Sequence, residues 1–525
     1  MTRAAAGILK TLLILIVIVA FASLALRAYN SLSGPPLQPW HKFVPTELHA
    51  DELDHADWAR YLAQEDVVMA QVRREVTDKL PQEARVSTNR YYEKSAVFPP
   101  HFDHDWNRSY VLEPKGPPQG VVVLLHGLTD SPYSLRHIAS HYVERGFVAI
   151  GIRMPGHGTV PAGLTDVRWE DWMAATKLAV REARRRVPAP APLHLVGFSN
   201  GGALAMKYSL DALNDPALPR ADRVVLLTPM IGITRFARFA GLAGLPAVLP
   251  PFARAAWLSI VPEFNPFKYN SFPVNGARQS FRLTDVLQAQ LQRAARESRR
   301  NSLPPVLTFQ SVIDYTVSAP AIITALYSNL PDNGSEIVLF DVNRTLKFAP
   351  LLRPSSYVAV DRLAPTTPQP YRFTVVTTSG DSDATIERSI APGELEAKVR
   401  PLDLKYPPGI FSLSHLAIPI PMDDPLYGMQ PDPATKGEFG YNLGAMDARG
   451  ERGALLVDQD FLARLPSNPF FPYVLERIDE VITKPPGASG RNIAATGNTG
   501  VPVRLEAMLS TLLPDDGEVQ PFAGP

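Results

Sequence analysis

The sequence predicts an α/β fold, built on a mostly parallel β-sheet with helices on both faces. From Gly120 onward, short and continuously apolar segments alternate with longer segments of helical spacing. Continuous apolar runs of this length are typical of parallel strands buried on both faces, and the longer segments suit crossover helices. A second observation is a tight, glycine-rich turn at residues 197–201, between one such strand and a helix-compatible run.

The predicted core begins with a strand at residues 121–125 and ends with a strand at 337–340. Between them we expect further strands at 148–152, from Leu193 into Gly197, at 223–228 and at 306–311. Helices are predicted at 134–145, at 169–186 and from the glycine-rich turn to about Leu210.

The turn itself reads Gly197-Phe198-Ser199-Asn200-Gly201. Between a buried strand and a helix, G-x-S-x-G forms a nucleophile elbow, in which the serine is held in a strained backbone conformation. Larger side chains two residues before or after the serine would collide with the neighbouring strand and helix. Ser199 is therefore the candidate nucleophile. In a chain with 33 glycines the same pattern also arises as a plain turn with a capping serine, so the rest of the chain has to support this interpretation.

Composition limits the classes of function. The chain has 525 residues, 45% of them hydrophobic, which is enough for a substantial core. Lys plus Arg and Asp plus Glu both number 52, so no basic excess suggests nucleic acid as a partner. There are no cysteines, which excludes disulfides, thiolate metal sites and cysteine nucleophiles.

The N-terminus predicts a membrane helix. Arg3 and Lys10 precede residues 11–26, sixteen residues without a charge, and with the flanking residues the run is just long enough to cross a bilayer. We interpret residues 1–30 as a signal anchor that leaves the large domain periplasmic or otherwise extracytoplasmic. The alternative is a signal peptide cleaved near Ala22, which would leave a secreted protein.

Residues 31–118 form a predicted N-terminal extension. Helical spacing at 48–80 indicates an amphipathic helix or helix pair, and strand-like pieces at 86–92 and 109–112 suggest an antiparallel edge for the sheet.

The motifs of the core resemble a known superfamily. His126-Gly127 after the first strand, Pro155-Gly156-His157-Gly158 after the second and the G-F-S-N-G turn after the third are similar to the α/β-hydrolase superfamily. The nearest branch is the group of monoacylglycerol lipases, carboxylesterases and serine aminopeptidases. The resemblance covers about residues 119–343 and a short piece near residue 415.

This resemblance implies a Ser-acid-His triad in that chain order. Of the 11 histidines, ten precede Ser199, so His415 becomes the predicted base. The acid is expected just beyond the strand at 306–311, where Asp314 begins a D-x-x-V pattern found in relatives. Asp341, after the next strand, is the second candidate acid.

The resemblance also assigns supporting roles. The backbone amides of Leu128 and Asn200 are the expected oxyanion donors. His126, Gly127, Gly197 and Gly201 support the motifs, and His157 shapes the mouth of the site. Arg153 stands where relatives commonly have an acidic residue. No metal or organic cofactor is required.

Two segments depart from the superfamily pattern. Residues 234–303 are a cap or lid insertion rich in Phe, Leu, Ala and Pro, either an ordinary cap with its own core or an apolar lid that faces a membrane. Residues 344–410 are an insertion that we expect to form a small β subdomain. The predicted organisation is 1–30 anchor, 31–118 extension, 119–233 and 304–343 hydrolase core, 234–303 cap, 344–410 insertion, 411–483 catalytic His loop with a strand at 453–457 and a terminal helix, and 484–525 flexible tail.

The prediction for function is a membrane-anchored serine hydrolase that cleaves carboxylic esters through an acyl-enzyme, with lipid or monoacylglycerol-like esters favoured. One alternative is amide or peptide hydrolysis of the serine aminopeptidase type. The other is a catalytically inactive envelope scaffold or binding protein that uses the fold alone.

Overall fold

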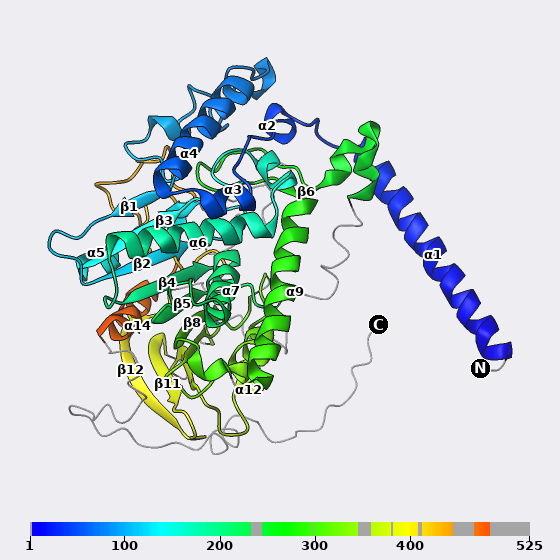
Figure 1. Cartoon of the computed structure of the whole chain (residues 1–525). Helices are drawn as coiled ribbons and strands as arrows, with labels where there is room; N and C mark the ends of the chain where they lie inside the picture. The colour runs from blue at the N-terminus through cyan, green and yellow to red at the C-terminus, as the bar shows by residue number, and fades with distance from the viewer. Residues whose placement is uncertain are drawn as a thin grey trace, which may run out of the picture.

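A ten-stranded sheet runs through the middle of the protein, with helices on both faces (Figure 1). The computed structural model describes residues 3–232, 244–297, 299–314, 316–344, 359–379, 382–407, 412–444 and 467–483. In space the strand order is β1-β3-β2-β4-β5-β8-β9-β10-β11-β12. The strands are β1 (Tyr110–Leu112), β2 (Gly120–Leu125), β3 (Phe147–Ile152), β4 (Leu193–Phe198), β5 (Arg223–Leu227), β8 (Val306–Ser311), β9 (Glu336–Phe340), β10 (Arg372–Thr378), β11 (Ala384–Ile390) and β12 (Ala397–Lys405).

The sheet is mostly parallel, as predicted. All strands from β3 to β10 in the spatial order pair in parallel, and the outer strands β1, β11 and β12 pair antiparallel. The parallel strands are rich in apolar residues, and β2 and β3 are apolar throughout, because both faces of the sheet are covered.

Strand β2 shows how the two faces divide. Val121, Val123 and Leu125 point into one core, with α6 (Trp169–Arg186) and α7 (Asn200–Asn214). Val122 and Leu124 point into the other core, with α5 (Arg136–Glu144) and α14 (Phe471–Thr483). This alternation puts helices on both faces of the sheet, which confirms the predicted fold class.

Most core elements lie where the sequence places them. The observed bounds of α6 and β8 equal the predicted ones, and β3, β5 and β9 differ by one residue at one end. The helix predicted at 134–145 is a 3-10 turn, η4 (Pro132–Leu135), followed by α5.

The N-terminal extension packs on the α6 side of the sheet. It contains α2 (Pro39–Lys42), α3 (Ala50–His55) and α4 (Trp58–Val72), and Leu53 and Tyr61 belong to the main core. The strand-like piece at 109–112 forms β1, but the strand expected at 86–92 is wrong. There Asn89 binds the local backbone at Ala84 O and Tyr91 N, and such bonds compete with a sheet ladder.

The insertion after β9 extends the main sheet. Strand β10 pairs in parallel with β9, and β11 and β12 continue antiparallel. In the described residues these three strands belong to the main sheet, whereas the sequence predicts a small β subdomain for residues 344–410. The predicted strand at 453–457 and the tail from residue 484 lie outside the described residues.

The cap segment lies beside the first helix of the chain. It contains η7 (Leu245–Val248), η8 (Pro250–Ala256), β6 (Trp257–Ser259), β7 (Phe272–Pro273) and the long helix α9 (Val274–Arg296). Helix α1 (Arg3–Leu32) projects away from the rest of the protein and meets it at the cap (Figure 1). Its Lys10–Leu32 part is long and apolar enough to cross a membrane, and no residue in its 18-residue apolar window is buried. The predicted cap boundaries at 234 and 303 stay a prediction.

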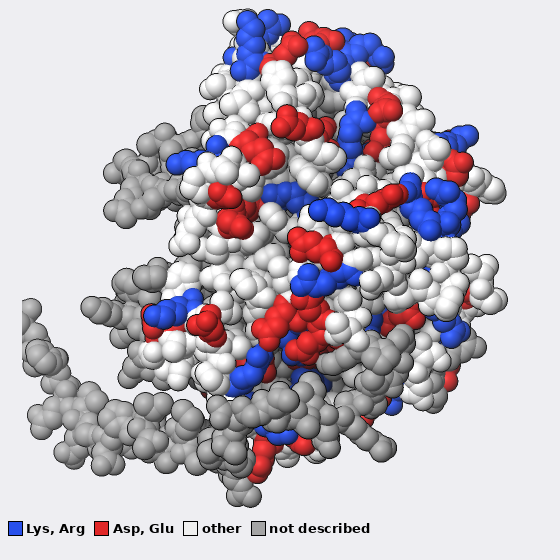
Figure 2. All heavy atoms as spheres, turned by 90° about the vertical axis from the view of Figure 1, so that its left-hand side faces the viewer, with Lys and Arg blue, Asp and Glu red and all other residues white. Residues whose placement is uncertain are grey.

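Surface charge is mixed on the side of the molecule shown in Figure 2. Acidic and basic side chains alternate there, and the view shows no continuous basic surface. This matches the equal numbers of acidic and basic residues in the sequence.

Candidate active site

Ser199 occupies a strained turn at the carboxyl end of the central strand β4. Its backbone has φ 54° and ψ −115°, in a region that residues other than glycine rarely adopt. The turn is held by its backbone: Ser199 N donates to Leu227 O at 3.0 Å, and Ser199 O accepts from Met230 N at 2.9 Å. Such strain is typical of a nucleophile elbow, which presents the serine side chain above the sheet.

Glycines make this turn possible by letting backbones approach. A Cβ on Gly201 would lie 1.9 Å from Leu125 O, and one on Gly197 would lie 2.5 Å from Gly201 O. Both positions exclude any larger residue, because the contacts are with backbone atoms that cannot move aside. A Cβ on Gly127 would lie 3.2 Å from the Ser199 Cβ, which is tight but less severe.

The predicted base and acid meet beside this turn. His415 Nδ1 lies 2.9 Å from Asp314 Oδ2, and the Asp314 side chain is fully shielded from solvent. Because an ionised carboxylate only accepts hydrogen bonds, Nδ1 is the protonated nitrogen and Nε2 is left as the acceptor. His415 and Ser199 line the same cavity, and in this structure the Ser199 hydroxyl makes no hydrogen bond to a described residue. Hydrogen bonds of this kind are often long without substrate.

Asp314 is kept ionised by its hydrogen bonds. Burial raises the pKa of its carboxyl, but the hydrogen bond and charge of His415 and the amides of Val317 and Thr316 outweigh burial, so the pKa is below its ordinary value. Gln310 Nε2 also donates to Asp314 Oδ2 at 3.0 Å. The second candidate acid, Asp341, lies elsewhere and binds Arg344 and Thr377.

The two predicted oxyanion donors lie on either side of the elbow, Leu128 in the cavity wall and Asn200 directly after Ser199. Leu128 lines the cavity, and Asn200 is the first residue of α7, where a helix leaves its amide without an intrahelical partner. Neither amide donates to another described residue. The Asn200 side chain is used differently, because its Oδ1 accepts from Ser280 Oγ of α9 at 2.8 Å and so ties the cap helix to the elbow.

His126 and His157 have structural positions. His126 Nδ1 contacts Gly127 O at 2.9 Å and its Nε2 accepts from Met154 N at 3.0 Å. His157 packs against the His126 ring, with centroids 5.0 Å apart. Burial lowers the pKa of both histidines to about 3, so both are neutral near pH 7. Neither ring lines the cavity.

The cavity above Ser199 is mostly apolar. Its volume is about 590 Å³, and the apolar part of its wall consists of Leu128, Phe198, Met230, Val261, Phe264, Phe272, Ala277 and Leu416. The cap supplies much of this wall. Its segment before β7 is fixed to the core, since Tyr269 N donates to Thr129 O at 2.8 Å and Tyr269 OH to Gly156 O at 2.9 Å.

Two charged residues in this wall were not predicted. Lys268, from the cap, and Asp130, two residues after Leu128, both line the cavity, with Nζ and Oδ1 3.7 Å apart. No local sequence signal marks them, because they come from segments far apart in the chain.

The loop that carries His415 is anchored by a buried cluster. Asp424 accepts from Arg136 Nη2 at 2.8 Å, His137 Nε2 at 2.9 Å and Tyr133 OH at 2.9 Å. Burial raises the pKa of the Asp424 carboxyl, but Arg136 and His137 outweigh it and hold the pKa well below its ordinary range. The cluster joins the segment after His415 to η4 and α5.

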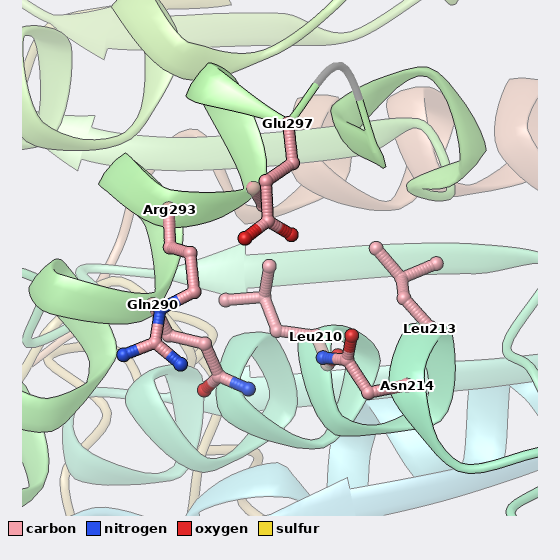
Figure 3. A pocket seen from close by; sticks show the side chains of 7 residues that line it. Leu210, Leu213, Asn214, Gln290, Arg293 and Glu297 are labelled. Atoms are coloured by element: carbon pink, nitrogen blue, oxygen red, sulfur yellow. The ribbon is translucent and has the colours of Figure 1, made fainter.

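A second cavity of about 270 Å³ lies away from Ser199, between α7 and α9. Figure 3 shows Arg293 of α9 and Glu297, the residue after this helix, facing Leu210, Leu213 and Asn214 of α7. It contains none of the predicted site residues. Within the described part of the chain, no group of three or more His, Asp or Glu side chains is placed to hold a metal ion.

Comparisons with known proteins match this core. Residues 116–340 match the family described as serine aminopeptidase, S33. A thermostable monoacylglycerol lipase from Bacillus sp. (strain H-257) is 24% identical over 239 residues, covering 45% of this chain and 82% of the lipase.

Solved structures also match at low identity. A chain reported for the metagenome-derived lipolytic enzymes LipS and LipT is 21% identical, with a TM-score of 0.35, and the match covers 49% of this chain and 96% of that chain. A soluble variant of monoglyceride lipase from Saccharomyces cerevisiae is 15% identical, with a TM-score of 0.34, covering 44% of this chain and 80% of that chain.

The sheet order and the family match define the core as an α/β-hydrolase. Within that superfamily, residues 116–340 belong to the branch of monoacylglycerol lipases, carboxylesterases and serine aminopeptidases, and the chain is a hydrolase.

Proposed function

We propose that the protein is a serine hydrolase that cleaves carboxylic esters through an acyl-enzyme. The contact of His415 with Asp314, together with the position of His415 and Ser199 in the wall of one cavity, carries this proposal. His415 Nε2 takes the Ser199 proton as Oγ attacks the acyl carbonyl, and the amides of Leu128 and Asn200 bind the oxyanion. His415 then protonates the leaving alcohol and later activates the water that releases the acid.

Apolar ester substrates fit the cavity better than peptides with a free amine. The wall is mostly apolar, and Asp130 is the one acidic residue among the described residues that line it. Since Lys268 lies 3.7 Å from Asp130, the cavity has no unbalanced carboxylate to bind a substrate ammonium. A monoacylglycerol lipase among the relatives agrees with a substrate that has an acyl chain.

Labelling and ester hydrolysis test the proposal together. We expect a fluorophosphonate probe to label Ser199, because only an activated serine reacts readily. We also expect hydrolysis of p-nitrophenyl esters, with kcat/KM rising by about tenfold or more from acetate to a medium-chain acyl group as the apolar wall is filled. Folded protein without labelling would reject the serine hydrolase and favour the scaffold alternative. Labelling with turnover of amides alone would favour a peptidase.

We further propose that α1 anchors the enzyme in a bilayer, with the cap at the membrane surface. Arg27 of α1 donates to Trp257 O, and Arg254 of the cap donates to Gly34 O at 2.7 Å. The elements η7 and η8 of the cap also contact α1, and the cap has four exposed large apolar side chains: Leu245, Val248, Leu249 and Leu258. Such a patch beside a membrane helix suits contact with the lipid leaflet.

Extraction of membranes tests the anchor. We expect the full chain to stay in the membrane pellet after an alkaline carbonate wash and a chain without residues 1–30 to be released, because a spanning helix is not displaced by pH or salt. Release of the full chain would contradict the anchor. An intact mass that lacks the segment up to Ala22 would show a cleaved signal peptide instead.

A further inference from the structure

Lys268 and Asp130 form a polar site in the wall of the active-site cavity. Their side chains are 10% and 2% exposed, and the ammonium lies 3.7 Å from Asp130 Oδ1. That distance is an ion pair but is longer than a hydrogen bond. The pair lies between the loop that carries the proposed oxyanion donor Leu128 and the cap.

The ammonium of Lys268 is held in place, but its hydrogen-bond donors are not used by the described residues. It lies 5.6 Å from the centre of the Phe198 ring and 5.3 Å from that of Tyr427, and it makes no hydrogen bond to a described residue. Its backbone is fixed, because Lys268 N donates to Asn265 Oδ1 at 3.1 Å and Lys268 O accepts from Arg90. A fixed ammonium with free donors, in the wall of a cavity, is placed to donate to a ligand oxygen.

The charge balance of the pair indicates which kind of ligand oxygen Lys268 would bind. Lys268 and Asp130 together are neutral, so an uncharged ligand keeps the buried site neutral. A carboxylate or an ammonium on the ligand would add an unbalanced buried charge. A hydroxyl suits the pair, since it accepts from Lys268 and has a proton to donate to the Asp130 carboxylate. Oδ1 of that carboxylate accepts from Ser134 Oγ at 2.7 Å, and Oδ2 has no hydrogen-bond partner among the described residues.

The position of the pair indicates which part of the ester it contacts. The Phe198 ring lies against Lys268 and also packs against His415, with ring centroids 5.4 Å apart. The leaving alcohol is the part of an ester that is protonated by the catalytic histidine. The polar site therefore lies on the side of the alcohol.

We propose that Lys268, balanced by Asp130, is a specificity-determining residue that binds an uncharged hydroxyl on the alcohol part of the ester. This proposal rests on the proposed ester hydrolysis at Ser199. It makes hydroxyalkyl esters the substrates that the cavity prefers, over alkyl esters of the same size and over esters with a charged alcohol part.

An isosteric pair of esters tests the preference. We expect the full chain in detergent to hydrolyse 2-hydroxyethyl hexanoate with a kcat/KM at least about tenfold above that for propyl hexanoate, measured by titration of the released acid. We expect Lys268→Met to bring this ratio close to one and Lys268→Arg to keep much of it. Lys398→Met, at an exposed position on β12, is the matched control and should leave the ratio unchanged.

Charged esters give an independent readout. In Asp130→Asn the charge of Lys268 is no longer balanced. We therefore expect the ratio of kcat/KM for the anionic hexanoyloxyacetate to kcat/KM for propyl hexanoate to be several-fold higher in this variant than in the unaltered protein. Equal rates of the unaltered protein on the isosteric pair would overturn the proposal, and so would its preference for hexanoyloxyacetate. Hydrolysis of p-nitrophenyl butyrate and labelling of Ser199 report the proposed function separately, so a failure of specificity is distinct from a failure of catalysis.

Discussion

Ser199→Ala and His415→Ala should each lower kcat/KM for a p-nitrophenyl ester by at least about 10³-fold, and the double variant should lose no more than the worse single variant. In a serine triad the nucleophile and the base act as one unit, so removal of either removes the same step. Asp314→Asn should lower kcat by about 10²- to 10⁴-fold, because an amide at this position no longer favours the tautomer in which Nε2 of His415 is the acceptor.

Matched variants separate catalysis from folding. His55→Ala changes an exposed histidine of α3 and should leave kcat/KM within about twofold. Asp341→Asn removes a buried carboxylate that binds Arg344 and Thr377, so we expect a loss of stability with kcat retained. Additive losses in Ser199→Ala/His415→Ala, or a large loss of kcat in Asp341→Asn but not in Asp314→Asn, would contradict the proposed triad.

Much of the fold could be predicted because its signals are local. A strand buried on both faces is mostly apolar, so β2 and β3 stand out as continuous apolar runs, and α6 lies between β3 and β4 with helical spacing. The turn at Ser199 could be predicted for the same reason. Its requirement for small residues, shown by the 1.9 Å approach at Gly201, is visible in the sequence itself.

Pairing between distant segments could not be predicted in the same way. The insertion after β9 contains strands that look like those of a small subdomain, and nothing in their residues says that β10 pairs with β9. Likewise, Lys268 and Asp130 have no fixed spacing, and only the folded cap brings them together. His415 could be predicted because a single histidine follows Ser199 in the chain, but its contact with Asp314 is a property of the folded chain.

Arg153 is a further case in which the sequence gives a position but no role. It stands where relatives commonly have an acidic residue, and the structure shows that it is fully buried. Its guanidinium donates to Glu47 at 2.7 and 2.9 Å, to Glu65 Oε1 at 3.2 Å and to His157 O at 3.0 Å. Both glutamates come from the N-terminal extension, so Arg153 fixes the extension to the loop beside the active site.

Arg153→Met should therefore lower the free energy of unfolding by about 3–5 kcal/mol, the largest loss of stability that we expect from a single change in this protein. The reason is the two carboxylates left behind. Glu65 is 1% exposed and Glu47 8%, and neither regains water when the guanidinium is removed. Urea unfolding of the full chain in detergent, at neutral pH, measures the loss as a shift of the midpoint.

Acid pH should reduce the difference in the free energy of unfolding between Arg153→Met and the unaltered protein. Burial raises the pKa of Glu65 and Arg153 lowers it, so without Arg153 the folded pKa of Glu65 rises further above its unfolded value. When the folded pKa of a carboxyl is raised, the folded protein loses stability as pH rises and regains it as pH falls. The variant should therefore regain stability between neutral pH and about pH 5. Arg73→Met is the matched control, because Arg73 also pairs with two acidic residues, Asp78 and Glu93, but on the surface. Its loss should stay below about 1 kcal/mol. If Arg153→Met costs no more than Arg73→Met, the buried network does not stabilise the extension on the core.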